Sequence, residues 1–175
     1  MKRMETIIIY SSKYGYTEDC VKSLADKING EVSVFNICNE KIPSIDEFDN
    51  IIIGGSIYMG QIQKKLKMYC TSNINALVNK RLVLFLCCGL PESFEQTLKN
   101  SFPDELLKKA VAKECFGGEL RTDRMNFAHK MIAGLMKKAE VKEGKSKVIQ
   151  MLENITILAE CINDIRKGDF HDEKI

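Results

Sequence analysis

The chain has 175 residues, of which 45% are hydrophobic and 29% charged, so it is long and apolar enough for about one domain with its own core. Its 26 Lys and Arg against 24 Asp and Glu give a net charge of only +2, which does not indicate nucleic-acid binding. The apolar runs are shorter than the roughly 20 residues of a membrane-spanning helix. The basic N-terminus is not followed by the apolar stretch of a signal peptide, so we expect a cytoplasmic protein.

The seven cysteines do not form a recognisable ligand or disulfide pattern. Their number is odd, they are widely spaced, and no C-x-x-C motif occurs. Neither a zinc site nor a disulfide framework is expected. Cys87 and Cys88 are adjacent, and ordinary packing at the end of a strand is the favoured interpretation, with a redox role left open.

Short apolar runs alternate along the chain with longer segments in which apolar residues recur at helical spacing. Strands are expected at 7–10, 32–37, 51–53, 82–88 and 111–116. Helices are expected at 20–28, 62–78 (broken near Asn73 or Asn75), 94–98, 103–110 and 148–165, the last capped by Ser146. The pair Gly54-Gly55 is expected to end the third strand.

This alternation predicts an α/β fold, a doubly wound parallel sheet of five strands with helices on both faces. We expect one domain over residues 1–175. In such sheets ligands bind beyond the carboxyl ends of the strands, where the strand order reverses. A site is therefore expected in the loops that follow Tyr10, Ile53, Cys88 and Phe116.

A basic amphipathic segment at about 121–147 is additional to this pattern. Apolar residues recur through it at helical spacing, and it holds eight Lys or Arg against three Asp or Glu, a local net charge of +5. It is interpreted either as a helix that packs on the sheet or as a surface for an anionic membrane or an acidic partner.

The loop over residues 11–18 carries the strongest chemical signal. It joins a buried strand to a helix start, where free N–H groups and a partial positive charge favour an anion. Hydroxyls of Ser11, Ser12 and Thr17 add donors, and Gly15 lets the backbone curve around a phosphate. An ordinary strand-to-helix turn with hydroxyl caps explains the same residues.

Two other phosphate motifs are excluded. The first strand is not followed by G-x-G-x-x-G, so the dinucleotide fingerprint is absent. Residues 55–60 begin like a nucleotide-binding P-loop, but Gln61 and Ile62 replace its Lys and Ser or Thr. Nucleotide hydrolysis is therefore not expected.

Two further loops have the composition of walls for a planar ligand. Residues 54–60 combine glycines with Tyr58 and Met59, and residues 87–91 contain Gly89. Each loop alone is a weak signal, because a tyrosine in a loop is more often a packed surface residue. Their order along the chain, after a loop rich in hydroxyls, is the informative feature.

That order, together with residues 12–17, resembles the flavodoxin family, which binds FMN. Ser12, Gly15 and Thr17 match the family's Ser/Thr-x-Thr-Gly-x-Thr phosphate loop, whereas Tyr14 departs from it. Within the family, residues 10–17, 53–60 and 117–120, followed by the basic stretch, look most like the branch that contains menaquinone-dependent protoporphyrinogen dehydrogenase.

The resemblance implies strand order 2-1-3-4-5 and an FMN site of three parts. The phosphate would be held by Ser11, Ser12, Lys13, Gly15, Tyr16 and Thr17. One side of the ring would be lined by Ser56, Ile57, Tyr58, Met59 and Gly60, and the other by Cys88, Gly89 and Leu90. No catalytic residue and no metal ligand is assigned.

Three functions remain open on the sequence alone. The first is an FMN-dependent oxidoreductase resembling protoporphyrinogen dehydrogenase, with a quinone or redox protein as partner and peripheral contact at the inner face of the membrane through 121–147. The second is a flavodoxin-type electron carrier that docks on protein partners. The third is an interaction module without cofactor. The electron donor, the acceptor and the oligomeric state are left open.

Overall fold

The computed structural model describes residues 4–119, 123, 130–131, 134–135 and 150–164. Their strands are β1 (Glu5–Ser11), β2 (Glu31–Asn36), β3 (Asn50–Tyr58), β4 (Gln61–Ile62), β5 (Arg81–Cys87) and β6 (Ala112–Cys115). Five of them pair in parallel in the order β2-β1-β3-β5-β6, and β4 pairs antiparallel with the end of β3. The predicted α/β fold and its strand order are confirmed.

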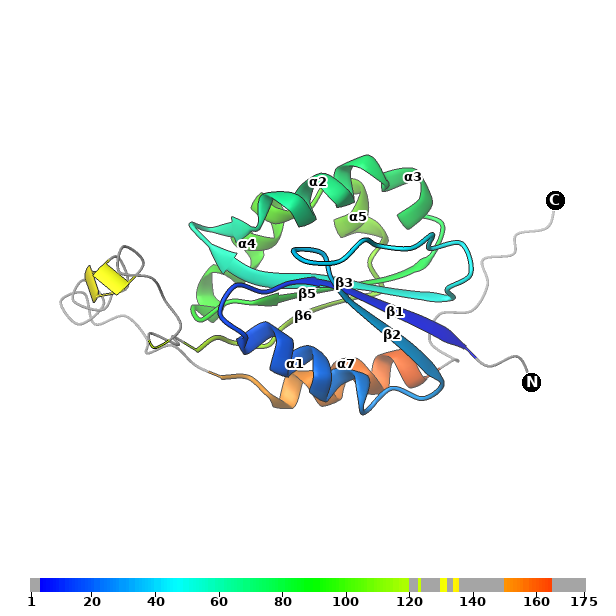
Figure 1. The fold of residues 1–175 in the computed structure, drawn as a ribbon, viewed down its shortest axis with the longest axis horizontal. Helices are drawn as coiled ribbons and strands as arrows, with labels where there is room; N and C mark the ends of the chain where they lie inside the picture. The colour runs from blue at the N-terminus through cyan, green and yellow to red at the C-terminus, as the bar shows by residue number, and fades with distance from the viewer. Residues whose placement is uncertain (1–3, 120–122, 124–129, 132–133, 136–149, 165–175) are drawn as a thin grey trace.

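The helices cover both faces of this sheet (Figure 1). They are α1 (Tyr16–Ala25), α2 (Lys64–Ser72), α3 (Ile74–Leu77), α4 (Phe94–Ser101), α5 (Asp104–Lys109) and α7 (Glu153–Asn163), with a short 3₁₀ helix η1 (Pro91–Ser93). Helices α1 and α7 lie on one face and α2 to α5 on the other. The second helical segment is expected to break near Asn73 or Asn75, and the break lies at Asn73, between the end of α2 at Ser72 and the start of α3 at Ile74.

Successive residues of the central strands feed two separate cores. Ile7 and Ile9 of β1 pack toward α2 and α4, whereas Ile8 packs toward α1 and α7. All three are fully buried. Because both faces are covered, β1, β3 and β5 are continuous apolar runs rather than alternating ones, as parallel strands of an α/β sheet require.

The expectation that Gly54-Gly55 ends the third strand is wrong, because β3 continues to Tyr58. A Cβ on Gly54 would lie 2.3 Å from the Phe85 carbonyl oxygen and 2.4 Å from the Phe85 ring. That ring stacks on Phe116 at a centroid distance of 4.9 Å. Glycine is required here for close packing against β5 inside the sheet and does not mark a turn.

The last helix begins at Glu153, not at 148. Before it, Gln150 bridges to Gly117, and the Met151 N–H donates to the Phe116 carbonyl at 3.2 Å. This pairing keeps the chain extended and delays the helix. Ser146, the predicted cap, and most of the segment 121–147 lie outside the described residues.

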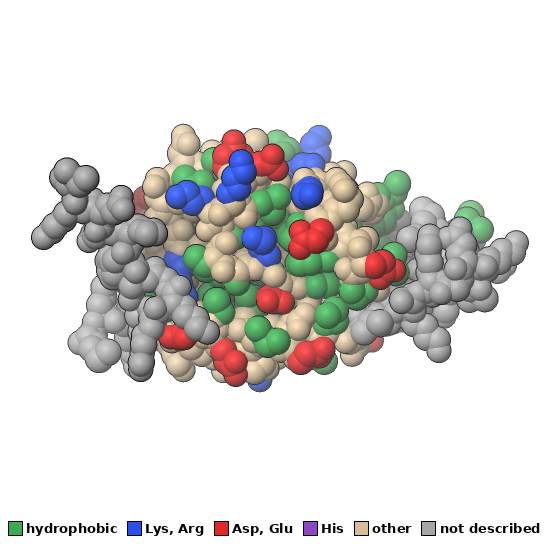
Figure 2. All heavy atoms as spheres, turned by 180° about the vertical axis from the view of Figure 1, so that it is seen from behind, with side chains coloured by type: hydrophobic (Ala, Val, Ile, Leu, Met, Phe, Trp, Pro, Cys, Tyr) green, Lys and Arg blue, Asp and Glu red, His purple; other side chains and the backbone are tan. Residues whose placement is uncertain are grey.

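The surface opposite to that of Figure 1 carries acidic and basic side chains mixed with apolar ones (Figure 2). Among the described helices, none has the length and apolar character needed to cross a membrane.

Arg81 ties the sheet to the C-terminal end of α7. Its guanidinium donates to the carbonyls of Cys161 at 2.7 Å and Ile162 at 2.9 Å, and to Asn50 Oδ1 at 3.3 Å. The carbonyls at the end of a helix lack intrahelical partners and carry partial negative charge. The Arg81 side chain supplies both hydrogen-bond donors and a positive charge to these carbonyls, and it thereby fixes α7 on the sheet.

Replacing Arg81 with leucine is expected to lower the free energy of unfolding by about 2–4 kcal/mol, because charged hydrogen bonds to helix carbonyls are lost. Chemical denaturation monitored by circular dichroism measures this. Lys22→Met serves as control, since it removes only the exposed pair with Glu18 at 2.8 Å and should leave the midpoint unchanged. Equal midpoints for Arg81→Leu and wild type would contradict the assignment.

Candidate functional site

The loops predicted to carry the site meet at one edge of the sheet, beyond the carboxyl ends of β1, β3 and β5. The ammonium of Lys13, in the β1–α1 turn, lies 4.3 Å from the ring centroid of Tyr58 at the end of β3. It also lies 5.7 Å from the Tyr14 ring centroid. The contact with Tyr58 brings the first and second predicted loops together.

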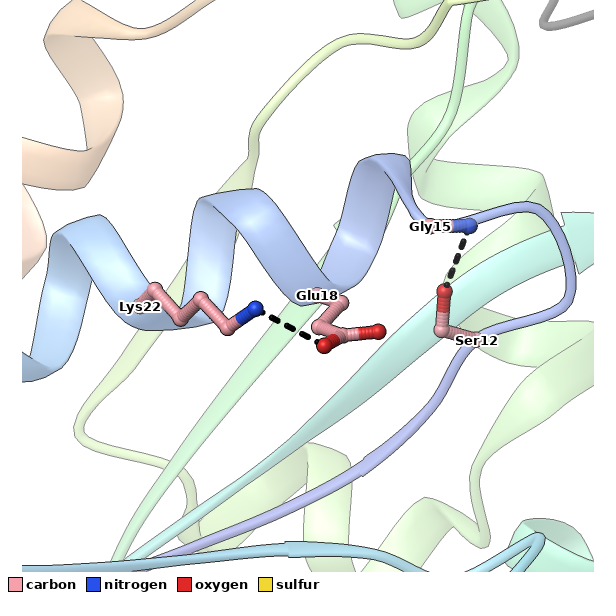
Figure 3. A network of polar contacts seen from close by, with 4 residues as sticks. All are labelled: Ser12, Gly15, Glu18 and Lys22. Atoms are coloured by element: carbon pink, nitrogen blue, oxygen red, sulfur yellow. Dashed lines mark hydrogen bonds and ion pairs between the residues drawn. The ribbon is translucent and has the colours of Figure 1, made fainter.

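The β1–α1 turn leaves the start of α1 without a side-chain cap. Gly15 occupies the N-cap position with φ +93° and makes no side-chain cap hydrogen bond to the helix. Its own N–H donates to Ser12 Oγ at 3.2 Å, which closes the turn on itself (Figure 3). The first N–H groups of a helix lack intrahelical acceptors, so this turn presents donors to an anion.

Two buried hydroxyls flank the turn without a partner. Ser11 Oγ and Thr17 Oγ1 are buried and form no hydrogen bond within the described residues. The Thr17 hydroxyl lies near the Cys87 thiol and acts to lower the pKa of that thiol. The two groups are nevertheless not placed to form a hydrogen bond with each other. Buried polar atoms are normally paired, so both hydroxyls can take an additional acceptor.

The Tyr16 side chain does not face the turn. Its hydroxyl donates to the Phe116 carbonyl at 2.7 Å, and the residue is buried. Burial raises the pKa of this phenol well above its ordinary value, so the hydroxyl remains a donor. Tyr16 thus braces the start of α1 against the end of β6, and only its backbone can contact a ligand in the turn.

The second predicted loop is mostly strand. Ser56, Ile57 and Tyr58 belong to β3, and only Met59 and Gly60 form the turn to β4. Both turn residues have positive φ, +52° and +78°, as a two-residue hairpin turn requires. The Met59 side chain is 79% exposed, so it protrudes at this edge of the sheet.

The third loop presents backbone rather than side chains. The Cys88 thiol is buried and donates to the Leu90 carbonyl at 3.4 Å. Gly89 lies against Gly118, where a Cβ would come within 2.8 Å of the Gly89 nitrogen. Burial raises the pKa of the neighbouring Cys87 thiol well above its ordinary value, and a contact with Cys20 adds to this rise, so its reactive thiolate form is disfavoured.

The rest of the described chain contains few other features of a binding site. A surface pocket of about 300 Å³ lies away from the three loops, lined by Glu95, Leu98, Lys99, Asp104, Leu107, Lys108 and Lys113. No cluster of potential metal ligands occurs among the described side chains.

The sequence did not predict β4 or the packing of Lys13 on Tyr58. Met59-Gly60 is not a typical hairpin dipeptide, and a cation–π contact between distant residues leaves no local sequence pattern.

Residues 7–147 match the family model described as flavodoxin domain, and the chain therefore belongs to this flavodoxin-domain family. A search of curated proteins gave no significant match.

Solved structures show the same fold at low sequence identity. The chain is similar to a short-chain flavodoxin associated with a non-canonical PDU bacterial microcompartment, with a TM-score of 0.56, 13% identity and coverage of 91% of this chain and 96% of that one. A WrbA-like flavodoxin from Agrobacterium tumefaciens matches with a TM-score of 0.55 and 16% identity, and the match covers 93% of this chain and 96% of that one. The Flv1 flavodiiron core from Synechocystis sp. PCC6803 matches with a TM-score of 0.52 and 13% identity, and the match covers 91% of this chain but only 36% of that one.

A Gly55→Ala substitution is expected to destabilise the protein by about 1–3 kcal/mol through overpacking. The added Cβ would lie 2.3 Å from Ser11 Oγ and 2.9 Å from the Ser11 carbonyl oxygen. The double variant with Ser11→Ala should recover only part of the loss, since the backbone clash remains. Thermal denaturation of both variants measures this, and an unaltered midpoint for Gly55→Ala would show that β1 and β3 are less closely packed.

Proposed function

We propose that this chain is an FMN-binding redox protein of the flavodoxin type. The observation that carries the proposal is the pair of buried hydroxyls of Ser11 and Thr17, which have no hydrogen-bond partner among the described residues, beside a helix N-terminus that lacks a side-chain cap. A phosphate in the turn would give both hydroxyls an acceptor and would meet the positive end of α1. Family membership supports the same ligand, because FMN binds flavodoxin-like sheets at the switch point between their first and third strands.

The chain's own residues would position the group. Backbone N–H groups of the β1–α1 turn would bind the phosphate, with Lys13 adding positive charge beside it. Tyr58, Met59 and Gly60 would lie along one side of the ring, and the Gly89-Leu90 backbone along the other. When bound, FMN supplies one- or two-electron transfer, and the protein supplies orientation and electrostatics.

A Ser12→Asp substitution tests the phosphate turn. A carboxylate about 4 Å from a phosphate charge costs roughly 4 kcal/mol at an effective dielectric constant of 20, so FMN affinity should fall at least about 100-fold after screening. Riboflavin, which lacks the phosphate, should bind within about threefold of wild type. Quenching of flavin fluorescence measures both.

Ser72→Asp is the matched control, since it makes the same charge change at an exposed residue of α2. Unchanged FMN affinity in Ser12→Asp would place the phosphate elsewhere. A wild-type protein that binds neither flavin would favour the third possibility, an interaction module without cofactor.

The finer proposal is an oxidoreductase resembling the menaquinone-dependent protoporphyrinogen dehydrogenase branch, and it is supported by the sequence likeness at 10–17, 53–60 and 117–120. The basic segment 121–147 would then contact the anionic inner face of the membrane, where the quinone lies. The alternative is a cytoplasmic electron carrier, supported by the exposed Met59 at the edge where an electron would leave the proposed site.

Turnover of protoporphyrinogen with a menaquinone analogue, in vesicles containing anionic lipid, separates these two functions. The enzyme should oxidise protoporphyrinogen in steady state, with a rate that falls at high salt because exposed charges are screened. A carrier should show no protoporphyrinogen turnover but should pass electrons to an added redox protein. Turnover that is independent of both salt and lipid charge would contradict a membrane role for the segment.

A further inference from the structure

The β3–β4 turn is held from outside the proposed flavin site, by α4 and α2. Asn100 Nδ2, near the end of α4, donates to the Gly60 carbonyl at 3.4 Å. Lys67 Nζ of α2 donates to Gln61 Oε1 at 3.0 Å and to the Asn100 carbonyl at 2.7 Å. One lysine therefore connects the turn to the residue that holds it.

The base of the hairpin is fixed more firmly than its tip. The Ile62 N–H donates to Ser101 Oγ at 3.1 Å, and both residues are buried. At the tip, Met59 is 79% exposed, and a Cβ on Gly60 would meet nothing within 4 Å. Within the described part of the chain, packing therefore does not hold the tip, and the hydrogen bond from Asn100 is a tertiary contact that reaches it.

A second residue of α4 orients the Asn100 amide. Gln96 Nε2 donates to Asn100 Oδ1 at 3.0 Å from one helical turn earlier. With the amide oxygen occupied by this bond, the Nδ2 group is directed to the Gly60 carbonyl.

The Met59-Gly60 turn has little support of its own, so a single external hydrogen bond can determine its conformation. Met59 adopts φ +52°, a region that residues with a Cβ rarely occupy. β4 contributes only two residues to the pairing, and a hairpin this short is marginal without external support. Residues at functional sites are often held in such conformations by their surroundings.

We propose that Asn100 is a positioning residue for the flavin ring. By holding the Gly60 carbonyl, Asn100 preforms the Met59-Gly60 turn, so the protein does not have to order it when the ring binds. The inference rests on the proposed function, because it assumes that this turn lines one side of the ring.

Asn100→Leu tests the role without adding charge. Loss of one hydrogen bond that preforms the turn should raise the dissociation constant of FMN about 3- to 10-fold. The dissociation constant of riboflavin should rise by the same factor, because the proposed site places this turn beside the ring and not beside the phosphate. Asn100→Gln, which keeps the amide donor, should recover part of the affinity.

Asn79→Leu is the matched control. Asn79 is also an exposed asparagine whose Nδ2 donates to a backbone carbonyl, that of Asn75 at 2.7 Å, but it follows α3 and lies outside the three loops. Its flavin affinities should equal those of wild type. An Asn100→Leu protein that binds both flavins within twofold of wild type would falsify the proposal.

Amide hydrogen exchange in the flavin-free protein gives a readout that needs no ligand. The amides of Gly60 and Gln61 should exchange faster in Asn100→Leu than in wild type, while the global unfolding midpoint stays the same. Unchanged exchange at these amides would overturn the proposal. Wild type that binds no flavin would defeat the proposed function instead, and the exchange result would still decide whether Asn100 fixes the turn.

Discussion

The proposed site depends on one backbone feature, the left-handed conformation of Gly15 at the start of α1. A residue with a Cβ rarely adopts φ +93°, and glycine does so without steric cost. The turn can therefore fold back far enough for Ser12 Oγ to accept a hydrogen bond from the Gly15 N–H. Because glycine has no side chain, the N-cap residue does not cover the first amides of the helix. A capping serine or aspartate at this position would stabilise α1 but would occupy the donors that an anion needs.

The three loops at this edge are each supported by a different part of the fold. Tyr16 joins the first turn to Phe116, and the phenol and the Met151 N–H share that carbonyl. Asn100 and Lys67 support the second turn, and close contact with Gly118 supports the third. Loops that carry a site on a parallel sheet gain their precision from such contacts with rigid elements. This arrangement explains why pairing within β4, which has only two residues, does not have to hold the hairpin alone.

The sequence predicts the sheet well because its central strands are buried on both faces and so appear as uninterrupted apolar runs such as 7–10 and 82–88. It fails where the reason for a residue is tertiary. Gly54 looks like a strand end but is a close contact with Phe85, and nothing local shows that the Tyr16 hydroxyl donates to a carbonyl 100 residues away. The start of α7 depends on a bridge between Gly117 and Gln150, which no local pattern encodes. The proposed phosphate turn is more accessible to sequence reasoning, because its residues are adjacent in the chain.

The fold does not decide between enzyme and carrier, since one fold hosts many activities, so the local charges must carry that distinction. Residues 59–72 supply the second turn and α2, and they contain three Lys and no Asp or Glu. Lys13, held over the Tyr58 ring, adds a cation on the same side. A cation near a group that accepts electrons stabilises the added negative charge, and the effect is larger where water is partly excluded. If FMN binds as we propose, the hairpin side of this edge would therefore make it easier to reduce than a carboxylate-lined edge would, and this property bears on the choice between the two proposed functions.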